Sequence, residues 1–91
     1  QLHVIIAMVK DKEVEKVLAL LPREAIYYFT QDQIPRALDK DKLSSMALAI
    51  GLRGKSYSNV SAAMKAAQSN AHADDLILVC GSVFIVAEVI H

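Results

Sequence analysis

The dipeptide Gly81-Ser82 is the part of this sequence best suited to chemistry. It follows the apolar run Leu76–Cys80 and precedes a second apolar segment, where a buried strand would pass into a helix. Glycine permits close approach of the backbone, and a serine with the following amides can bind an anionic oxygen at a helix start. A carboxylate or phosphate would suit this position, although the simpler interpretation is that Ser82 only caps its own helix.

A second candidate is the pair Asp11-Lys12, which follows the first apolar run of the chain. A lysine at the carboxyl end of a strand can neutralise a bound carboxylate or phosphate. The alternative is that Asp11 is an N-cap and Lys12 a solvated surface charge, as lysines usually are. Arg36 is similarly either an anion-binding fork or an exposed loop charge.

Other reactive side chains have simpler interpretations. The histidines lack the spacing of a metal site or of a base beside a nucleophile, so we expect them to be structural or solvent-exposed. They are His3, His72 and His91. The aromatic run Tyr27–Phe29 is expected to pack in the core, and Cys80 to be a small buried residue.

The first half of the chain predicts two strand–helix units. Leu2–Val9 is a nearly continuous apolar run typical of a buried parallel strand, and Ile26–Phe29 lies in a second predicted strand, residues 24–30. Each is followed by a helical pattern, the first capped by Asp11 and stopped by Pro22, the second capped by Asp39 after a loop that contains Pro35. Gly51 suits the left-handed position after the second helix. The predicted buried helix positions are Val14, Val17, Leu18 and Leu21 in the first helix and Leu43, Met46, Ala47 and Ile50 in the second.

The second half repeats the pattern. A short strand is predicted at Lys55–Tyr57, followed by a helix capped by Ser58 or Asn59. The Asp74-Asp75 pair leads into the strand Leu76–Cys80. After Gly81-Ser82, apolar spacing predicts a last helix with Val83, Phe84, Val86, Ala87 and Ile90 on it. We therefore expect a three-layer, Rossmann-like α/β fold with a mostly parallel sheet flanked by helices.

Composition narrows the class of protein. The 91 residues are 54% hydrophobic, which is sufficient for a single compact domain spanning residues 1–91. Ten basic and ten acidic residues cancel and are interspersed, so nucleic acid is not an expected partner. One cysteine excludes a disulfide framework, and neither a signal peptide nor a membrane-spanning stretch is evident, so a cytoplasmic location is expected.

The two ends of the chain suggest that it is cut from a longer protein. It starts directly on a predicted strand without a methionine and stops within an apparent helical pattern. It also has no Gly-x-x-x-x-Gly-Lys-Ser/Thr phosphate loop and no Gly-x-Gly-x-x-Gly fingerprint, so it lacks the usual means of holding a nucleotide alone.

Three segments together resemble the C-terminal domain of bacterial folylpolyglutamate synthase and dihydrofolate synthase, within the Mur ligase superfamily. They are Met8–Glu13, Pro35–Ala37 and Leu78–Glu88, and the resemblance spans nearly the whole chain in the same order. It implies an ATP-dependent amide ligase of folate biosynthesis and one-carbon metabolism. In such an enzyme, ATP phosphorylates a carboxylate of dihydropteroate or a reduced folate, and the amino group of L-glutamate attacks the acyl phosphate.

The resemblance also implies a division of labour. ATP and Mg²⁺ would be held mainly by an N-terminal ATPase domain of the same polypeptide, and the isolated chain would be inactive, without tightly bound cofactor or metal. Lys12 resembles the position that neutralises a carboxylate of the incoming glutamate, Ser82 and Phe84 resemble residues that frame it, and Asp11 would orient the loop. Glu13 departs from the aspartate common in the family, and Arg36 is a family marker without an assigned role.

Two other interpretations remain open at this point. A stand-alone α/β module could bind an anion at Gly81-Ser82 and a partner protein through Val83, Phe84 and Ile85. A flavodoxin-like receiver domain is a weaker alternative, because the expected acidic cluster at a strand end is not evident.

Overall fold

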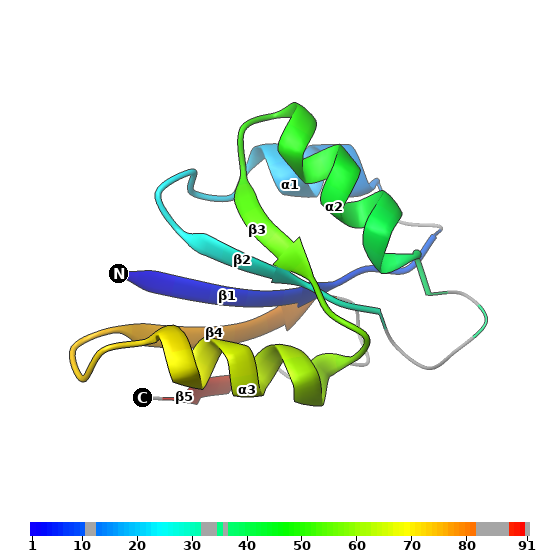
Figure 1. Cartoon of the computed structure of the whole chain (residues 1–91). Helices are drawn as coiled ribbons and strands as arrows, with labels where there is room; N and C mark the ends of the chain where they lie inside the picture. Colours follow the sequence, from blue (N-terminus) through cyan, green and yellow to red (C-terminus); the bar gives the residue numbers. More distant parts are fainter. Residues whose placement is uncertain (11–12, 32–34, 36, 82–87, 91) are drawn as a thin grey trace.

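The computed structural model describes residues 1–10, 13–31, 35, 37–81 and 88–90 (Figure 1). Five strands and three helices alternate along the described chain until the last two strands. They are β1 (Leu2–Ala7), α1 (Val14–Ala19), β2 (Ile26–Phe29), α2 (Lys40–Ala49), β3 (Arg53–Ser56), α3 (Val60–Asn70), β4 (Leu76–Gly81) and β5 (Glu88–Ile90).

The strands form one sheet in the order β3-β2-β1-β4-β5. The first four strands are parallel, with β1 at the centre between β2 and β4. Helices α1 and α2 cover one face of the sheet and α3 covers the other (Figure 1). This arrangement confirms the predicted three-layer Rossmann-like fold with a mostly parallel sheet.

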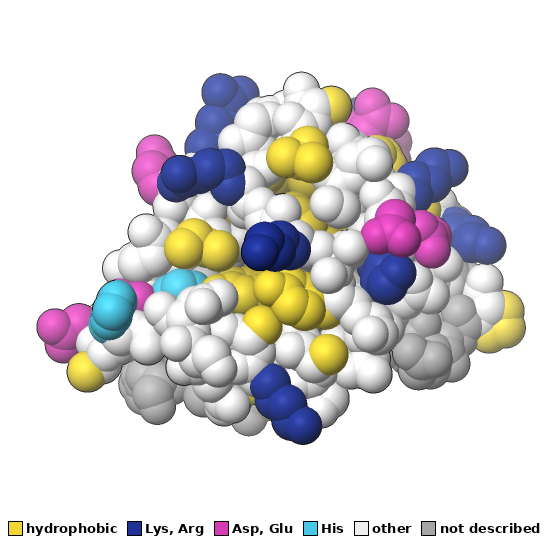
Figure 2. Space-filling view, in the orientation of Figure 1, with side chains coloured by type: hydrophobic (Ala, Val, Ile, Leu, Met, Phe, Trp, Pro, Cys, Tyr) yellow, Lys and Arg dark blue, Asp and Glu magenta, His cyan; other side chains and the backbone are white. Residues whose placement is uncertain are grey.

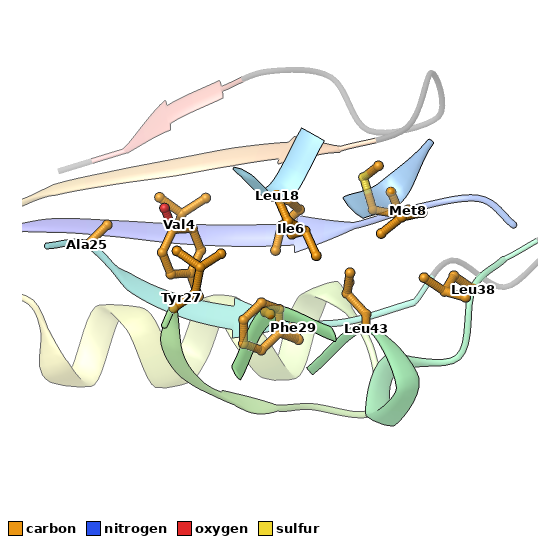
Figure 3. Packing of buried hydrophobic residues seen from close by; sticks show 12 residues of the cluster. Val4, Ile6, Met8, Leu18, Ala25, Tyr27, Phe29, Leu38 and Leu43 are labelled. Atoms are coloured by element: carbon orange, nitrogen blue, oxygen red, sulfur yellow. The ribbon is translucent and has the colours of Figure 1, made fainter. Parts of the chain in front are cut away.

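The larger core lies between the sheet and the pair α1 and α2 (Figure 3). Alternate residues of the strands point into it, because successive side chains of a strand face opposite sides of the sheet. Tyr27 and Phe29 stack with ring centroids 5.9 Å apart and are fully buried, as the sequence predicted. The cluster consists of Val4, Ile6, Met8, Val14, Leu18, Ala25, Tyr27, Phe29, Leu38, Leu43, Ala47 and Leu52.

The smaller core lies beneath α3. Ala63 and Ala67 are completely buried against the sheet, and their small side chains allow this helix to approach it closely. Their partners on the sheet include Ile5 and Tyr28, the residues that alternate with those of the larger core. Val60 and Met64 pack at the margin of this cluster.

Helix ends agree with the sequence in most places. The Asp39 side chain accepts hydrogen bonds from the backbone amides of Asp41 and Lys42, and Asn59 accepts one from Ala62. Gly51 has a φ of 91°, the left-handed conformation that glycine adopts without strain.

The start of α1 corrects one prediction. The helix begins at Val14 with Glu13, not Asp11, at the N-cap position, and Asp11 itself lies outside the described residues. Glu13 makes no capping hydrogen bond, and its carboxylate instead pairs with Lys16. Of the four predicted buried positions, Val14 and Leu18 are buried, Leu21 packs partly buried against the core after the end of the helix, and Val17 is 37% exposed.

The third strand also lies earlier than predicted, at Arg53–Ser56 instead of residues 55–57. Gly54 has low strand propensity, and pairing with β2 overrides it. Gly54 is required there, since a Cβ atom at this position would overlap the carbonyl of Tyr27 and the Phe29 ring.

The predicted last helix is wrong at its end. Residues 88–90 form β5, which pairs antiparallel with β4 through Val79 opposite Glu88 and Ile77 opposite Ile90. Val89 and Ile90 are β-branched and suit a strand, and pairing with the edge of β4 outweighs the helical spacing of the apolar residues. Val83, Phe84, Val86 and Ala87, which also carried this prediction, lie outside the described residues.

Candidate functional site

The carboxyl ends of the parallel strands meet at one edge of the sheet, which is where α/β domains of this type bind ligands. Ala7 at the end of β1 lies opposite Gly81 at the end of β4. The segments that follow these two strands therefore leave the sheet from adjacent positions. We refer to this side of the sheet as the carboxyl edge.

Backbone hydrogen bonds join the chain segments after β1 and β2. The amide of Thr30 donates to the carbonyl of Ile6 at 2.9 Å, and the amide of Leu38 donates to the carbonyl of Met8 at 2.8 Å. Val9 and Ala37 form an antiparallel bridge. These bonds extend the order of the sheet beyond the strands, so the first residues of both loops are fixed in place.

The predicted site residues Asp11, Lys12, Ser82 and Phe84, and also Arg36, lie outside the described residues. Their described neighbours are at the carboxyl edge: Lys10 and Glu13 flank the first pair, and Gly81 immediately precedes Ser82. The roles of Lys12, Ser82, Phe84 and Asp11 in binding therefore remain predictions.

A groove of about 470 Å³ opens at this edge between α1 and α2. Its charged lining consists of three lysines and two glutamates, and its floor is apolar. Lys16 is paired with Glu13 at 3.3 Å, whereas the side chains of Lys10 and Lys42 are exposed and make no ion pair with a described residue. The lining residues are Lys10, Glu13, Val14, Glu15, Lys16, Leu38, Lys42 and Met46.

The sequence analysis missed Lys10 and Lys42 as site candidates. Lys10 adjoins Asp11-Lys12, so its position after β1 was a usable signal. Lys42 gave no such signal, because only the packing of α2 beside α1 brings it to the groove. Two exposed lysines that make no ion pair with a described residue can attract the carboxylate or phosphate of a ligand.

The beginning of α2 is tied to the end of β3. The hydroxyl of Ser56 donates to Oδ1 of Asp41 at 2.8 Å, and Lys40 pairs with the other oxygen of Asp41 at 3.2 Å. The Ser56 hydrogen bond, and then Lys40, lower the pKa of the Asp41 carboxyl below its ordinary value. The carboxylate stays ionised and anchors the helix start.

A buried polar cluster lies at the opposite, amino-terminal edge of the sheet. His3 is 1% exposed, with its Nδ1 atom 2.8 Å from the Tyr28 hydroxyl and its Nε2 atom 2.9 Å from Oδ2 of Asp75. Asn70 donates to the Tyr28 hydroxyl, and the backbone amide of His72 donates to Asp75. We call His3, Tyr28, Asn70 and Asp75 the His3 cluster.

The His3 cluster has a structural role. It joins the starts of β1 and β4 to β2 and to the end of α3, far along the strands from the carboxyl edge. We predicted that each histidine is either structural or solvent-exposed. His3 is structural, and the side chain of His72 is exposed. His91 lies outside the described residues. Among the described residues no group of three or more His, Cys, Asp or Glu side chains is arranged to hold a metal ion.

In the described part of the chain, no helix has the length and apolar character needed to cross a membrane.

The element order, parallel sheet and helices on both faces define a Rossmann-like α/β domain. Residues 1–83 match the family described as Mur ligase, glutamate ligase domain. The match covers nearly all of the 91 residues, so the chain belongs to this family. The resemblance drawn from the sequence is thereby confirmed.

Solved structures of folylpolyglutamate synthases have the same fold. A bifunctional folylpolyglutamate synthase/dihydrofolate synthase from Yersinia pestis matches with a TM-score of 0.78 and 24% identity, over 90% of this chain and 20% of that one. E. coli FolC in complex with DHPP and ADP matches with a TM-score of 0.74 and 27% identity, over 90% and 19%. Mycobacterium tuberculosis folylpolyglutamate synthase complexed with ADP and AMPPCP matches with a TM-score of 0.70 and 27% identity, over 88% and 20%.

The chain thus spans about a fifth of the length of these solved structures. A comparison with curated proteins gave no match.

Proposed function

We propose that this chain is the C-terminal domain of an ATP-dependent folylpolyglutamate/dihydrofolate synthase, and that it helps to bind the incoming glutamate and to close the active site between two domains. The main support for the proposal is the way β1 and β4 pair in this chain, which belongs to the glutamate ligase domain family. Ala7 lies opposite Gly81, so the segments that bear Lys12 and Ser82 start side by side at the carboxyl edge.

The electrostatics of the carboxyl edge support an anionic substrate. Lys10 and Lys42 lack a described protein partner, and Lys12 adds a third cation in the same stretch of sequence as Lys10. A glutamate molecule carries two carboxylates, and charge-assisted hydrogen bonds from lysine are among the stronger ones that a protein makes. We assign Lys12 to a carboxylate of glutamate and Ser82 and Phe84 to the walls around it, with Asp11 orienting the loop.

Nucleotide and metal would be bound elsewhere. The chain has no phosphate loop, and the described residues include no metal-binding group. The similar solved structures contain ADP, AMPPCP, or AMPPNP with a manganese ion. We propose that ATP and Mg²⁺ bind mainly to an N-terminal domain of the same polypeptide, where ATP activates a carboxylate of dihydropteroate or a reduced folate as an acyl phosphate.

The role of the present chain is to bring the glutamate amine to that activated carboxylate. Cations of the carboxyl edge would hold the carboxylates of glutamate and leave its amino group free to attack. Closure of the domain over the cleft would exclude water, which would otherwise compete with the amine.

The first test is substitution of Lys12→Ala and Ser82→Ala in the whole ligase. Each change should raise the KM for glutamate and leave the KM for ATP nearly unchanged, with a loss on the order of 1 to 3 kcal/mol for a charge-assisted contact. Glutamate-dependent ADP release, measured with dihydropteroate and with tetrahydrofolate, provides the readout.

The matched control is Lys65→Ala, which removes an exposed lysine from α3 on the other face of the sheet. It should leave both KM values unchanged. If the Lys12 and Ser82 variants use glutamate as well as the unchanged enzyme does, the assignment of both residues is wrong.

A second test concerns the division of labour. The 91-residue chain alone should neither hydrolyse ATP nor form an amide bond, because the nucleotide-binding parts would lie in the other domain. Turnover by the purified chain would contradict the proposed arrangement and would favour an independently active module.

A further inference from the structure

Strand β3 is at one edge of the described sheet, with β2 on its inner side. The backbone amide of Tyr57 donates to the carbonyl of Phe29 at 2.8 Å, so alternate residues of this segment are turned toward β2. Because a parallel strand alternates the direction of its backbone groups, Gly54 and Ser56 present their N–H and C=O groups outward. These groups can pair with an added strand.

The side chains of β3 make this edge basic on the α3 side of the sheet. Arg53 and Lys55 are both exposed on that side, and neither makes an ion pair or hydrogen bond with a described residue. Tyr57 follows them at the next alternate position and packs on Tyr28, with ring centroids 5.7 Å apart. The side chains of an added strand would therefore lie next to Arg53, Lys55 and Tyr57 in turn.

A groove of about 430 Å³ runs beside these residues. Figure 2 shows hydrophobic side chains gathered over the seam between β3 and α3, with basic side chains at the margins of the band. No carboxylate is among the described residues that line the groove. They are Gln1, Ile26, Tyr27, Tyr28, Arg53, Gly54, Lys55, Tyr57 and Asn70.

We propose that the β3 edge binds an extended acidic segment of a partner protein, which adds to the sheet as a further strand. Backbone hydrogen bonds to Gly54 and Ser56 hold the segment, in the manner of other β-strand additions. Its side chains on the α3 side follow the pattern acidic, any residue, acidic, any residue, apolar, so that they meet Arg53, Lys55 and Tyr57. This binding surface is separate from the carboxyl edge and does not depend on the proposed ligase function.

The positive charges of Arg53 and Lys55 favour an acidic partner strand over a second copy of this chain. Two copies that paired through β3 would bring two arginines and two lysines onto the same face, and like charges across neighbouring strands are destabilising. Basic side chains on edge strands generally oppose such self-association. The same cations favour an acidic strand, whose carboxylates pair with them.

The experiment uses a fluorescein-labelled peptide with the sequence Thr-Glu-Thr-Glu-Thr-Phe and a matched peptide with lysine in place of glutamate. Fluorescence polarisation measures binding, and hydrogen exchange of the Gly54 and Ser56 amides reports its location. We expect saturable binding of the acidic peptide only, with slower exchange at both outward amides and little change at Lys55, whose amide already faces β2.

The double variant Arg53→Glu/Lys55→Glu should weaken binding of the acidic peptide at least tenfold, since both cross-strand charge pairs become repulsive. Lys16→Glu/Lys42→Glu, on the other side of the sheet, is the control and should bind as the original chain does. Absence of binding at millimolar peptide, binding that survives the charge reversal, or unchanged exchange at Gly54 and Ser56 would overturn the proposal. Self-association of the chain through β3 would overturn it as well, because the occupant would then be a second copy.

Discussion

The polar side chains at the two ends of the sheet differ in burial and in hydrogen bonding. In the His3 cluster, at the amino-terminal end, three ionisable side chains are buried and hydrogen-bonded to one another. At the carboxyl edge, Lys10 and Lys42 are exposed and have no described protein partner. The difference separates polar groups that stabilise the fold from polar groups without a partner among the described residues.

One arrangement of protons satisfies the whole His3 cluster. With the ring proton of His3 on Nε2, the ring donates to the Asp75 carboxylate, and Nδ1 accepts from the Tyr28 hydroxyl, which in turn accepts from Asn70. Burial, first of all, raises the pKa of Tyr28, so its hydroxyl keeps the proton that it donates. No described buried side-chain nitrogen or oxygen lacks a partner, so the buried polar atoms of this cluster are satisfied within the protein.

The substitution His3→Ala should have the largest effect and tests whether the His3 cluster stabilises the fold. Removal of the ring leaves the Tyr28 hydroxyl and the Asp75 carboxylate without their shared partner and creates a cavity, so stability should fall by about 2 to 4 kcal/mol. Urea denaturation followed by circular dichroism measures the change. His72→Ala, which truncates an exposed histidine, should shift stability by less than about 0.5 kcal/mol. Equal effects of the two changes would show that the His3 cluster is not a stabilising element.

A smaller effect is expected from pH. The hydrogen bond from His3, and then that from the His72 amide, lower the pKa of the Asp75 carboxyl far below its ordinary value. The unfolded chain therefore binds a proton at this group before the folded chain does. Stability from Asp75 is fully present above the ordinary pKa of about 3.9 and is lost as pH falls below it.

Urea midpoints measured between about pH 6 and pH 2.5 test this expectation. The original chain should lose stability steadily below about pH 4, and Asp75→Asn should flatten the acid limb of the curve. Some slope should remain in that variant, because the Asp41 pKa is lowered too. An unchanged acid limb in Asp75→Asn would contradict the role given to this carboxylate.

The same contrast explains how far the sequence could predict the structure. Local sequence patterns predicted the structure correctly where interactions between near neighbours decide the conformation. Asp39 and Asn59 cap their helices, and Gly51 takes the left-handed conformation. Ile26–Phe29 forms a strand, as predicted. Local patterns failed where pairing with a distant strand decides. Residues 88–90 had helical spacing but pair with β4, and β3 begins at Arg53 because β2 holds it.

The site was harder to predict than the fold. The relation of His3 to Asp75 spans 72 positions in the sequence, and nothing local distinguishes either residue from an exposed one. Lys42 looks like any helix-surface lysine until α2 packs beside α1. Gly81 could be anticipated at a strand end because it follows a strongly apolar run, and its position opposite Ala7 follows from parallel pairing of β1 with β4.

The smallest expected effect on stability comes from the double variant Lys10→Ala/Lys42→Ala. Neither side chain has a described ion pair, so the free energy of unfolding should change by less than about 0.5 kcal/mol. In the whole ligase the same change should raise the KM for glutamate severalfold, because it removes positive charge from the carboxyl edge. A stability loss above about 1 kcal/mol would place these lysines with the structural residues, whereas an unchanged KM would show that Lys10 and Lys42 have no part in glutamate binding.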